Sequence, residues 1–127
     1  MEWSYLIDPG RGIVHLTVAG EVTSHGLIEL IKRTGADSRF GPGMHAIADC
    51  RQAHGNWDYC EIQRFRDFLQ RISAPRPVRW ATVLKPGTLT AVGQVCDLIG
   101  DAVAGRIEIQ LFTDPQQAQE WIAEETV

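Results

Sequence analysis

The sequence lacks the features that direct a protein to a membrane, to secretion or to a nucleic acid. Its longest uncharged stretch, Pro86 to Cys96, contains Gly, Thr and Gln and is far shorter than the roughly 20 apolar residues that cross a bilayer. Met1 to Ser4 offers neither a positive flank nor an apolar run, so we expect no signal peptide and a cytoplasmic location. A net charge of −4 gives no overall attraction to nucleic acid or anionic lipid.

Cysteine is too scarce for a disulfide framework. The three cysteines, Cys50, Cys60 and Cys96, form no Cys-x-x-Cys pair, so we expect free thiols in a reducing compartment. The tightest cluster of metal-ligand residue types is Cys50, His54 and Cys60, and no fourth ligand is obvious beside it. We therefore expect no metal and no other cofactor.

Signatures of catalysis are missing as well. The sequence has no Gly-x-Ser-x-Gly elbow, no Walker-type loop and no Gly-x-Gly-x-x-Gly fingerprint. Cys50, His54 and Asp49 could be drawn as nucleophile, base and orienting group, but neighbouring residues of one loop seldom converge in that way. We expect that the protein is not an enzyme.

Charge is unevenly distributed along the chain. Residues 51–85 hold seven basic side chains and three acidic ones, whereas residues 86–127 hold one basic and seven acidic side chains. This asymmetry has two interpretations, a local basic face or an ordinary solvated helix surface.

The 127 residues, 44% hydrophobic and 22% charged, fit one globular domain over residues 1–127 with a single core. Residues 3–8 and 12–19 are β-rich and are separated by a Pro/Gly turn at 9–12, which predicts a hairpin. A helical period follows from Ser24 to about Gly35. Met44 to Asp49 is typical of a short buried strand.

The second half continues the alternation. After a polar loop at 51–57, Asp58 and Glu61 form a capping-box pattern at the start of a helix that Pro75 ends. The remaining elements are a strand at Val78 to Leu84, a helix at Thr88 to about Ala104, a strand at Arg106 to Phe112 and a last helix capped by Asp114. The order β-β-α-β-α-β-α-β-α predicts an α/β fold, a mostly parallel five-stranded sheet with an antiparallel edge hairpin and four main helices.

Two segments carry a family resemblance. Ala46 to Arg51 is an apolar strand that closes on Asp-x-Arg, and Leu111 to Ile122 reads Phe-x-Asp, then Ala, then Trp-Ile. Both patterns resemble the STAS domain, the fold of anti-sigma-factor antagonists, and its SpoIIAA-like or STAS/SEC14-like relatives. The resemblance covers nearly the whole chain and implies a SpoIIAA-like fold whose relatives bind protein partners or small ligands.

One departure from that family limits what can be carried over. Antagonists of this kind have a phosphorylated Ser at the start of the helix after the central strand. Here the matching segment, Asp49 to Trp57, contains no Ser or Thr. The phosphorylation switch is therefore not expected, and the fold alone does not assign a function.

The carboxyl edge of the predicted parallel sheet is the expected place for a ligand or partner, because helix N-termini also offer N–H groups there. Its candidate residues follow two successive strands: Asp49, Arg51, His54, Trp57, Lys85 and Thr88. Arg51 and Lys85 near helix N-termini would favour an anion. The alternative is that these are ordinary polar loop residues.

The predicted helix from Thr88 to Ala104 carries a second apolar row, Ala91, Val95, Leu98 and Ala102, beside the stripe that covers the sheet. A helix that is apolar over most of its circumference is usually buried on more than one side. This row predicts a homodimer or a protein-partner interface, unless neighbouring helices of the same chain cover it.

Two functions therefore stay open. The first is a non-enzymatic regulatory or interaction module that docks another protein or a copy of itself. The alternative is a carrier or sensor of a small anionic or lipid-like molecule. Neither involves nucleic acid or membrane insertion.

Overall fold

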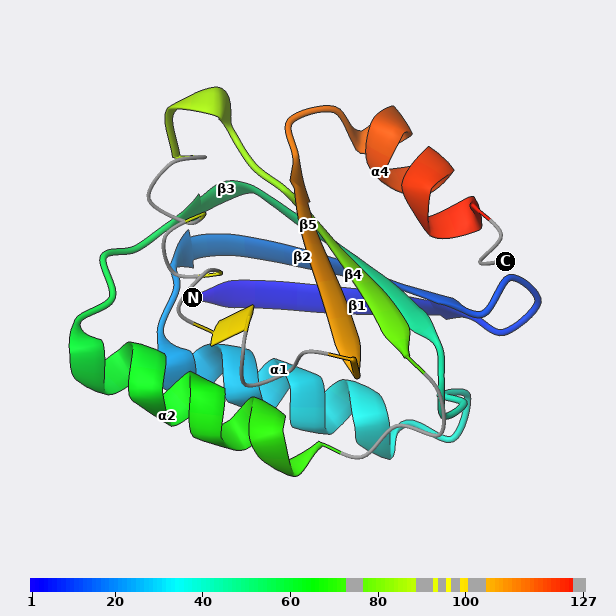
Figure 1. Cartoon of the computed structure of the whole chain (residues 1–127), viewed down its shortest axis with the longest axis horizontal. Helices are drawn as coiled ribbons and strands as arrows, with labels where there is room; N and C mark the ends of the chain where they lie inside the picture. Colours follow the sequence, from blue (N-terminus) through cyan, green and yellow to red (C-terminus); the bar gives the residue numbers. More distant parts are fainter. Residues whose placement is uncertain (73–76, 89–92, 94–95, 97–98, 101–104, 125–127) are drawn as a thin grey trace.

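The protein is built on a twisted five-stranded sheet with helices on both faces (Figure 1). The computed structural model describes residues 1–72, 77–88, 93, 96, 99–100 and 105–124. The strands lie side by side in chain order: β1 (Glu2–Asp8), β2 (Ile13–Glu21), β3 (His45–His54), β4 (Val78–Val83) and β5 (Ile107–Phe112). The described α-helices are α1 (Ser24–Ala36), α2 (Tyr59–Arg71) and α4 (Pro115–Ala123).

The edge hairpin is confirmed. β1 and β2 are antiparallel, with pairs running from Glu2 opposite Ala19 to Asp8 opposite Ile13. In the turn, the Gly12 amide donates to the Asp8 carbonyl at 3.0 Å. Gly12 has a φ of 68°, a conformation that glycine adopts without the steric cost of a Cβ.

The crossover prediction is also confirmed. β3 is parallel to both β2 and β4, and β4 is parallel to β5. Figure 1 shows α1 and α2 together on one face of the sheet and α4 on the other. The carboxyl ends of four strands therefore meet at one edge, and their amino ends meet at the opposite edge.

The alternation of side chains along each strand determines which helices pack on each face of the sheet. In β2, Val14, Leu16 and Val18 are buried in one cluster with Leu30 of α1. Each such side chain contributes about 1.5 to 3 kcal/mol when it leaves water. A separate cluster packs α4 on β3, β4 and β5: Ile47, Ala81, Val83, Phe112, Ala118 and Ile122.

The predicted C-terminal boundary of β3 was wrong. The strand was expected to end at Asp49 and to give way to a loop, but it continues to His54. Its last residues pair with the end of β2, Gly20 with Ala53 and Glu21 with His54, after a register shift between Thr17 and Ala19. Because this end of the strand is largely exposed, its polar side chains had the composition of a loop.

The predicted count of four main helices does not match the three α-helices of the described residues. Thr88, the expected first residue of the additional helix, instead ends a 3₁₀ turn, η1 (Pro86–Thr88). Its amide and hydroxyl both bind the Lys85 carbonyl, at 3.0 and 2.9 Å, which closes a tight i to i+3 turn. The predicted interface row, Ala91, Val95, Leu98 and Ala102, lies outside the described residues.

Candidate functional site

The predicted site lies where β3 and β4 end, and its best-defined feature is an ion pair. Arg51 lies two residues after Asp49 on β3, within the register shift between β2 and β3, and the two side chains meet. Arg51 Nε and Nη2 donate to the two Asp49 carboxylate oxygens at 3.0 and 2.8 Å. These bonds lower the pKa of Asp49. The positive charge that was expected to attract an anion is therefore already matched within the chain.

Trp57 is a structural residue in this arrangement. Its indole Nε1 donates to the Val22 carbonyl at 2.9 Å, and its ring meets Phe65 edge-on, with centroids 5.4 Å apart. The Val22 amide in turn donates to the His54 carbonyl at 2.7 Å. The loop after β2 and the loop after β3 are thus joined to each other, and the Trp57 indole N–H and the His54 carbonyl both have partners within the chain.

The first turns of α1 and α2 are joined by a polar cluster that sequence reasoning missed. Ser24 is fully buried. Its amide and hydroxyl both donate to the Glu61 carboxylate at 3.3 Å, and Arg64 Nη1 donates to the Ser24 hydroxyl at 3.0 Å. Glu61 was expected to complete a capping box within its own helix, but its carboxylate binds α1 instead.

Helix capping uses one amide group at each of three helix N-termini on this edge. Thr23 accepts from the Gly26 amide, Asp58 from the Glu61 amide, and Asp114 from the Gln116 amide. An anion at a helix N-terminus needs such donors unpaired. The carboxyl edge therefore offers less anion recognition than its sequence suggested.

Lys85 and Thr88 belong to the loop after β4 and are not joined to the Asp49–Arg51 pair. Lys85 is exposed, and its carbonyl is used by η1. In the part of the chain that the structure describes, no hydrogen bond or ion pair links either residue to Arg51 or His54.

Cys50 and Cys60 lie in different environments. Cys50 packs in the core beneath α1, and burial raises the pKa of its thiol to about 12. Cys60 is exposed at the start of α2. Among the described residues, no three side chains of His, Cys, Asp or Glu come together as metal ligands.

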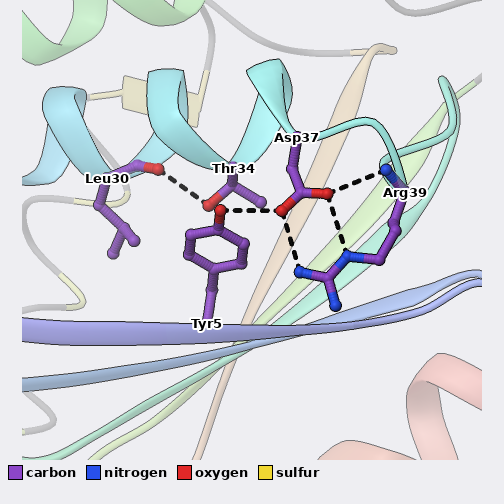
Figure 2. Close-up of polar contacts among 5 residues, drawn as sticks. All are labelled: Tyr5, Leu30, Thr34, Asp37 and Arg39. Atoms are coloured by element: carbon purple, nitrogen blue, oxygen red, sulfur yellow. Dashed lines mark hydrogen bonds and ion pairs between the residues drawn. The ribbon is translucent and has the colours of Figure 1, made fainter.

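A polar cluster at the other end of α1 fixes the edge strand (Figure 2). The Tyr5 hydroxyl of β1 donates to Asp37 Oδ2 at 3.0 Å, and Arg39 binds both oxygens of the same carboxylate at 3.1 and 3.0 Å. Hydrogen bonds from Arg39 hold the pKa of Asp37 well below its ordinary value. Since every group in the cluster has a partner within it, its role is to tie β1 to α1.

A hollow opens on the other face of the sheet, beside α4, and sequence reasoning missed it. It is an open groove of about 800 Å³, and we call it the α4 groove. Its floor is formed by residues near the amino ends of β2 and β3: Arg11, Ile13, His15, His45 and Ile47. Its wall is formed by residues of α4 and its C-cap: Gln116, Gln119, Glu120, Ala123 and Glu124, with Ile122 at the base.

The wall of the groove is one stripe of a helix. Its residues follow the spacing i, i+3, i+4, i+7 and i+8, and all five are exposed. The opposite stripe, which includes Ala118 and Ile122, is buried on the sheet. α4 therefore uses one face to pack on the sheet and leaves a second, polar face beside the groove.

Arg79 of β4 holds the end of that wall in place. Its Nη1 donates to the Trp121 and Glu124 carbonyls at 2.7 and 2.8 Å, and its guanidinium lies 5.3 Å from the Trp121 ring centroid. The Arg79 amide donates to Nδ1 of His45 at 2.9 Å. Carbonyls at a helix C-terminus are satisfied well by a cation, so this contact fixes α4 against the sheet.

Beyond the groove, half of this sheet face is open. Leu6 lies opposite His15, which lies opposite Ile47, so the three share the α4 side. Leu6 is 62% exposed, and Ser4 and Thr17 in the next row are also exposed. We call the α4-side face of β1 and β2, with Ser4, Leu6 and Thr17, the open half of the sheet. No described helix covers it (Figure 1).

Comparison with known proteins defines the class of fold. No protein-family model matches the sequence, and no curated protein matches it. A solved structure of an uncharacterised protein of the DUF3478 family with a SpoIIAA-like fold, from Shewanella loihica PV-4, superposes with a TM-score of 0.60. The two chains are 14% identical, and the match covers 94% of this chain and 93% of the other. The fold is SpoIIAA-like, as the sequence resemblance implied.

The helices give no indication of a membrane span. Within the described residues, none is both long and apolar enough to cross a bilayer.

Proposed function

We propose that the protein is a non-enzymatic interaction module that docks a protein partner on the α4 side of its sheet. The observation that carries this proposal is the open half of the sheet beside the α4 groove. Leu6, which is 62% exposed, supplies an apolar contact on this surface, and the exposed stripe of α4 beside the groove supplies a polar rim.

The polar groups at the carboxyl edge of the sheet are largely paired within the chain, which favours the α4 side as the place where a partner docks. Arg51 is neutralised by Asp49, the Trp57 indole is bound to a backbone carbonyl, and the helix N-termini are capped by side chains. Phosphorylation of the kind used by anti-sigma-factor antagonists is not part of the proposal, because Asp49 to Trp57 contains no Ser or Thr.

The alternative is a carrier of a small anionic or lipid-like molecule. The volume of the α4 groove, about 800 Å³, favours it, because ligand pockets commonly measure about 300 to 1,000 Å³. The groove is open, however, and carries Glu120 and Glu124 on its wall. A lipid-like anion would be recognised by an enclosed apolar cavity with a basic group, which is a different arrangement.

Site-specific photocross-linking in the native host tests the proposal. A benzophenone amino acid is placed at Thr17, in the open half of the sheet. The matched control carries it at Gln70, which is also exposed but belongs to α2 on the other face of the sheet. We expect a discrete cross-linked protein at Thr17 and none of the same mass at Gln70. Identical products at both positions, or none at Thr17, would show that this face is not a docking surface.

Native mass spectrometry of gently purified protein tests the alternative. A carrier should retain a bound small molecule, seen as a fixed mass increment that denaturation removes. Such an increment, together with the absence of a cross-link at Thr17, would favour the carrier over the docking module.

A further inference from the structure

We infer that the α4 groove and the open half of the sheet dock a cationic amphipathic helix of a protein partner. The inference rests on the proposed function and adds the secondary structure and the charge of the partner. It combines the width of the uncovered surface, the apolar contact on it and the carboxylates along the groove.

The uncovered surface has the dimensions of one helix. Neighbouring strands are about 4.8 Å apart, and a helix with its side chains is about 10 Å across, so a helix covers roughly two strands. α4 packs on β3, β4 and β5, which leaves β1 and β2. A helix laid there would run beside α4 in the groove, at the usual separation of packed helices of about 8 to 10 Å.

The floor supplies the apolar contact that such a helix needs. Leu6, which is 62% exposed, and the partly buried Ile13 of the groove are the apolar side chains that a docked helix would contact. Ile47 shares their side of the sheet, but it is buried with α4. An extended segment would instead add to the free edge of β1 through backbone hydrogen bonds. It would not need the α4-side face, so the features on that face favour a helix as the occupant.

The charge of the groove selects a cationic partner. Glu120 and Glu124 lie one helical turn apart on the wall, and neither carboxylate has an ion-pair partner among the described residues. Arg11 on the floor already pairs with Asp8 at 3.8 Å, and the other nitrogen bases of the floor are the imidazoles of His15 and His45. Lys or Arg side chains along one flank of a docked helix would meet both carboxylates.

The same charges disfavour other occupants. In a two-fold dimer formed through this surface, each copy would bring its own carboxylates to the interface, so like charges would meet. Nucleic acid and anionic lipid carry the charge of the groove and would be repelled. A cationic helix fits both the shape and the charge of the α4 groove and the open half of the sheet.

Binding of two synthetic peptides to the full chain tests the inference by fluorescence anisotropy. One peptide of about 18 residues places Leu and Lys at helical spacing, and the other has the same composition with Leu and Lys alternating as in a strand. We expect the helical peptide to bind at least about tenfold more tightly, a difference of about 1.4 kcal/mol. Equal affinity for the two peptides would overturn the assignment of a helix.

Charge reversal locates the binding surface. Glu120→Lys combined with Glu124→Lys should weaken the helical peptide by about tenfold, or about 1.4 kcal/mol, and it should not unfold the chain, because Lys is favourable at a helix C-terminus. The matched control, Glu21→Lys with Asp67→Lys, changes the net charge equally at exposed positions outside the groove. Equal weakening by both pairs would show unspecific attraction and would overturn the inference.

Truncation tests the apolar contact. Leu6→Ala should weaken the helical peptide, whereas Tyr59→Ala, at a side chain 72% exposed on α2, should not. If Thr17 cross-links a partner through a strand or an acidic segment, the present inference is wrong while the proposed function stands. If Thr17 cross-links nothing, the proposed function fails as well.

Discussion

Replacing Arg79 by Met should detach the carboxyl end of α4 from the sheet. The Arg79 side chain is 11% exposed, so its bond to the Trp121 carbonyl is partly shielded from water, whereas its bond to the Glu124 carbonyl lies at the surface. Met retains an apolar chain of similar length that can still cover Trp121, but it has no donors. The substitution therefore removes the hydrogen bonds while keeping most of the packing.

The expected loss of stability follows from those two bonds. A hydrogen bond from a charged donor contributes about 1.5 to 3 kcal/mol. The Glu124 carbonyl is at the surface, where water can replace the guanidinium, so the lower end of that range applies to it. The free energy of unfolding should fall by about 3 to 4.5 kcal/mol, a large part of the roughly 5 to 15 kcal/mol of a typical domain. At about 1.5 kcal/mol per M of urea, the midpoint falls by about 2 to 3 M.

Urea unfolding followed by far-UV circular dichroism measures this change, and amide hydrogen exchange locates it. Arg79→Lys should lie between the wild type and Arg79→Met, because an ammonium cannot reproduce the planar fork of a guanidinium. Glu108→Gln is the control for the ion pair of Arg79, which spans 3.8 Å to a carboxylate that is 62% exposed; it should cost less than about 1 kcal/mol. Unchanged stability of Arg79→Met, or unchanged exchange in α4, would refute the reasoning.

Three further outcomes are expected. In the native protein Cys60 should react rapidly with a thiol reagent and Cys50 only slowly, because Cys60 is exposed whereas Cys50 is partly buried and the pKa of its thiol is about 12; rapid labelling of Cys50 would contradict its placement. Because the pKa of Asp37 is lowered in the folded protein, its carboxylate stabilises the fold at pH values above its ordinary pKa of 3.8. This stabilisation is lost as the pH falls through the pKa of the folded state. Acid titration of unfolding should therefore show a steeper loss of stability for the wild type than for Asp37→Asn between about pH 4 and pH 2, and parallel curves would argue against it. Trp57→Phe should lower the free energy of unfolding by about 1 to 2 kcal/mol through the lost indole hydrogen bond, measured in urea, and an unchanged value would mean that the bond contributes nothing.

The elements were predictable where their signals are local. Alternation of Val14, Leu16 and Val18 predicted a strand with one buried face, and those three side chains are buried. Asp58 and Asp114 predicted helix starts, and each caps the helix that follows. These predictions hold because capping and periodicity involve residues within one turn or one strand of each other.

Boundaries and partners were not predictable in the same way. The polar end of β3, from Arg51 to His54, had the composition of a loop, and it became a strand because β2 supplies hydrogen-bonding partners there. Glu61 had the spacing of a capping box, yet a serine 37 positions away took its carboxylate. In both cases a distant segment competed with a local interaction and prevailed.

By itself, the sequence determined the order of the five strands and the antiparallel hairpin, because these depend on periodicity and turns, and its resemblance to the STAS domain implied the SpoIIAA-like class of the fold. It also placed Asp49, Arg51 and Trp57 near the carboxyl edge, but it could not indicate that they bind one another or the backbone. Only the tertiary structure decided that α4 lies alone among the described helices on its face and leaves a groove beside it. That groove joins the amino ends of β2 and β3 to a helix at the far end of the sequence. From the sequence, the exposed stripe of α4 that lines the groove could not be distinguished from an ordinary solvated helix face, because proximity to a distant strand leaves no periodic pattern in the sequence.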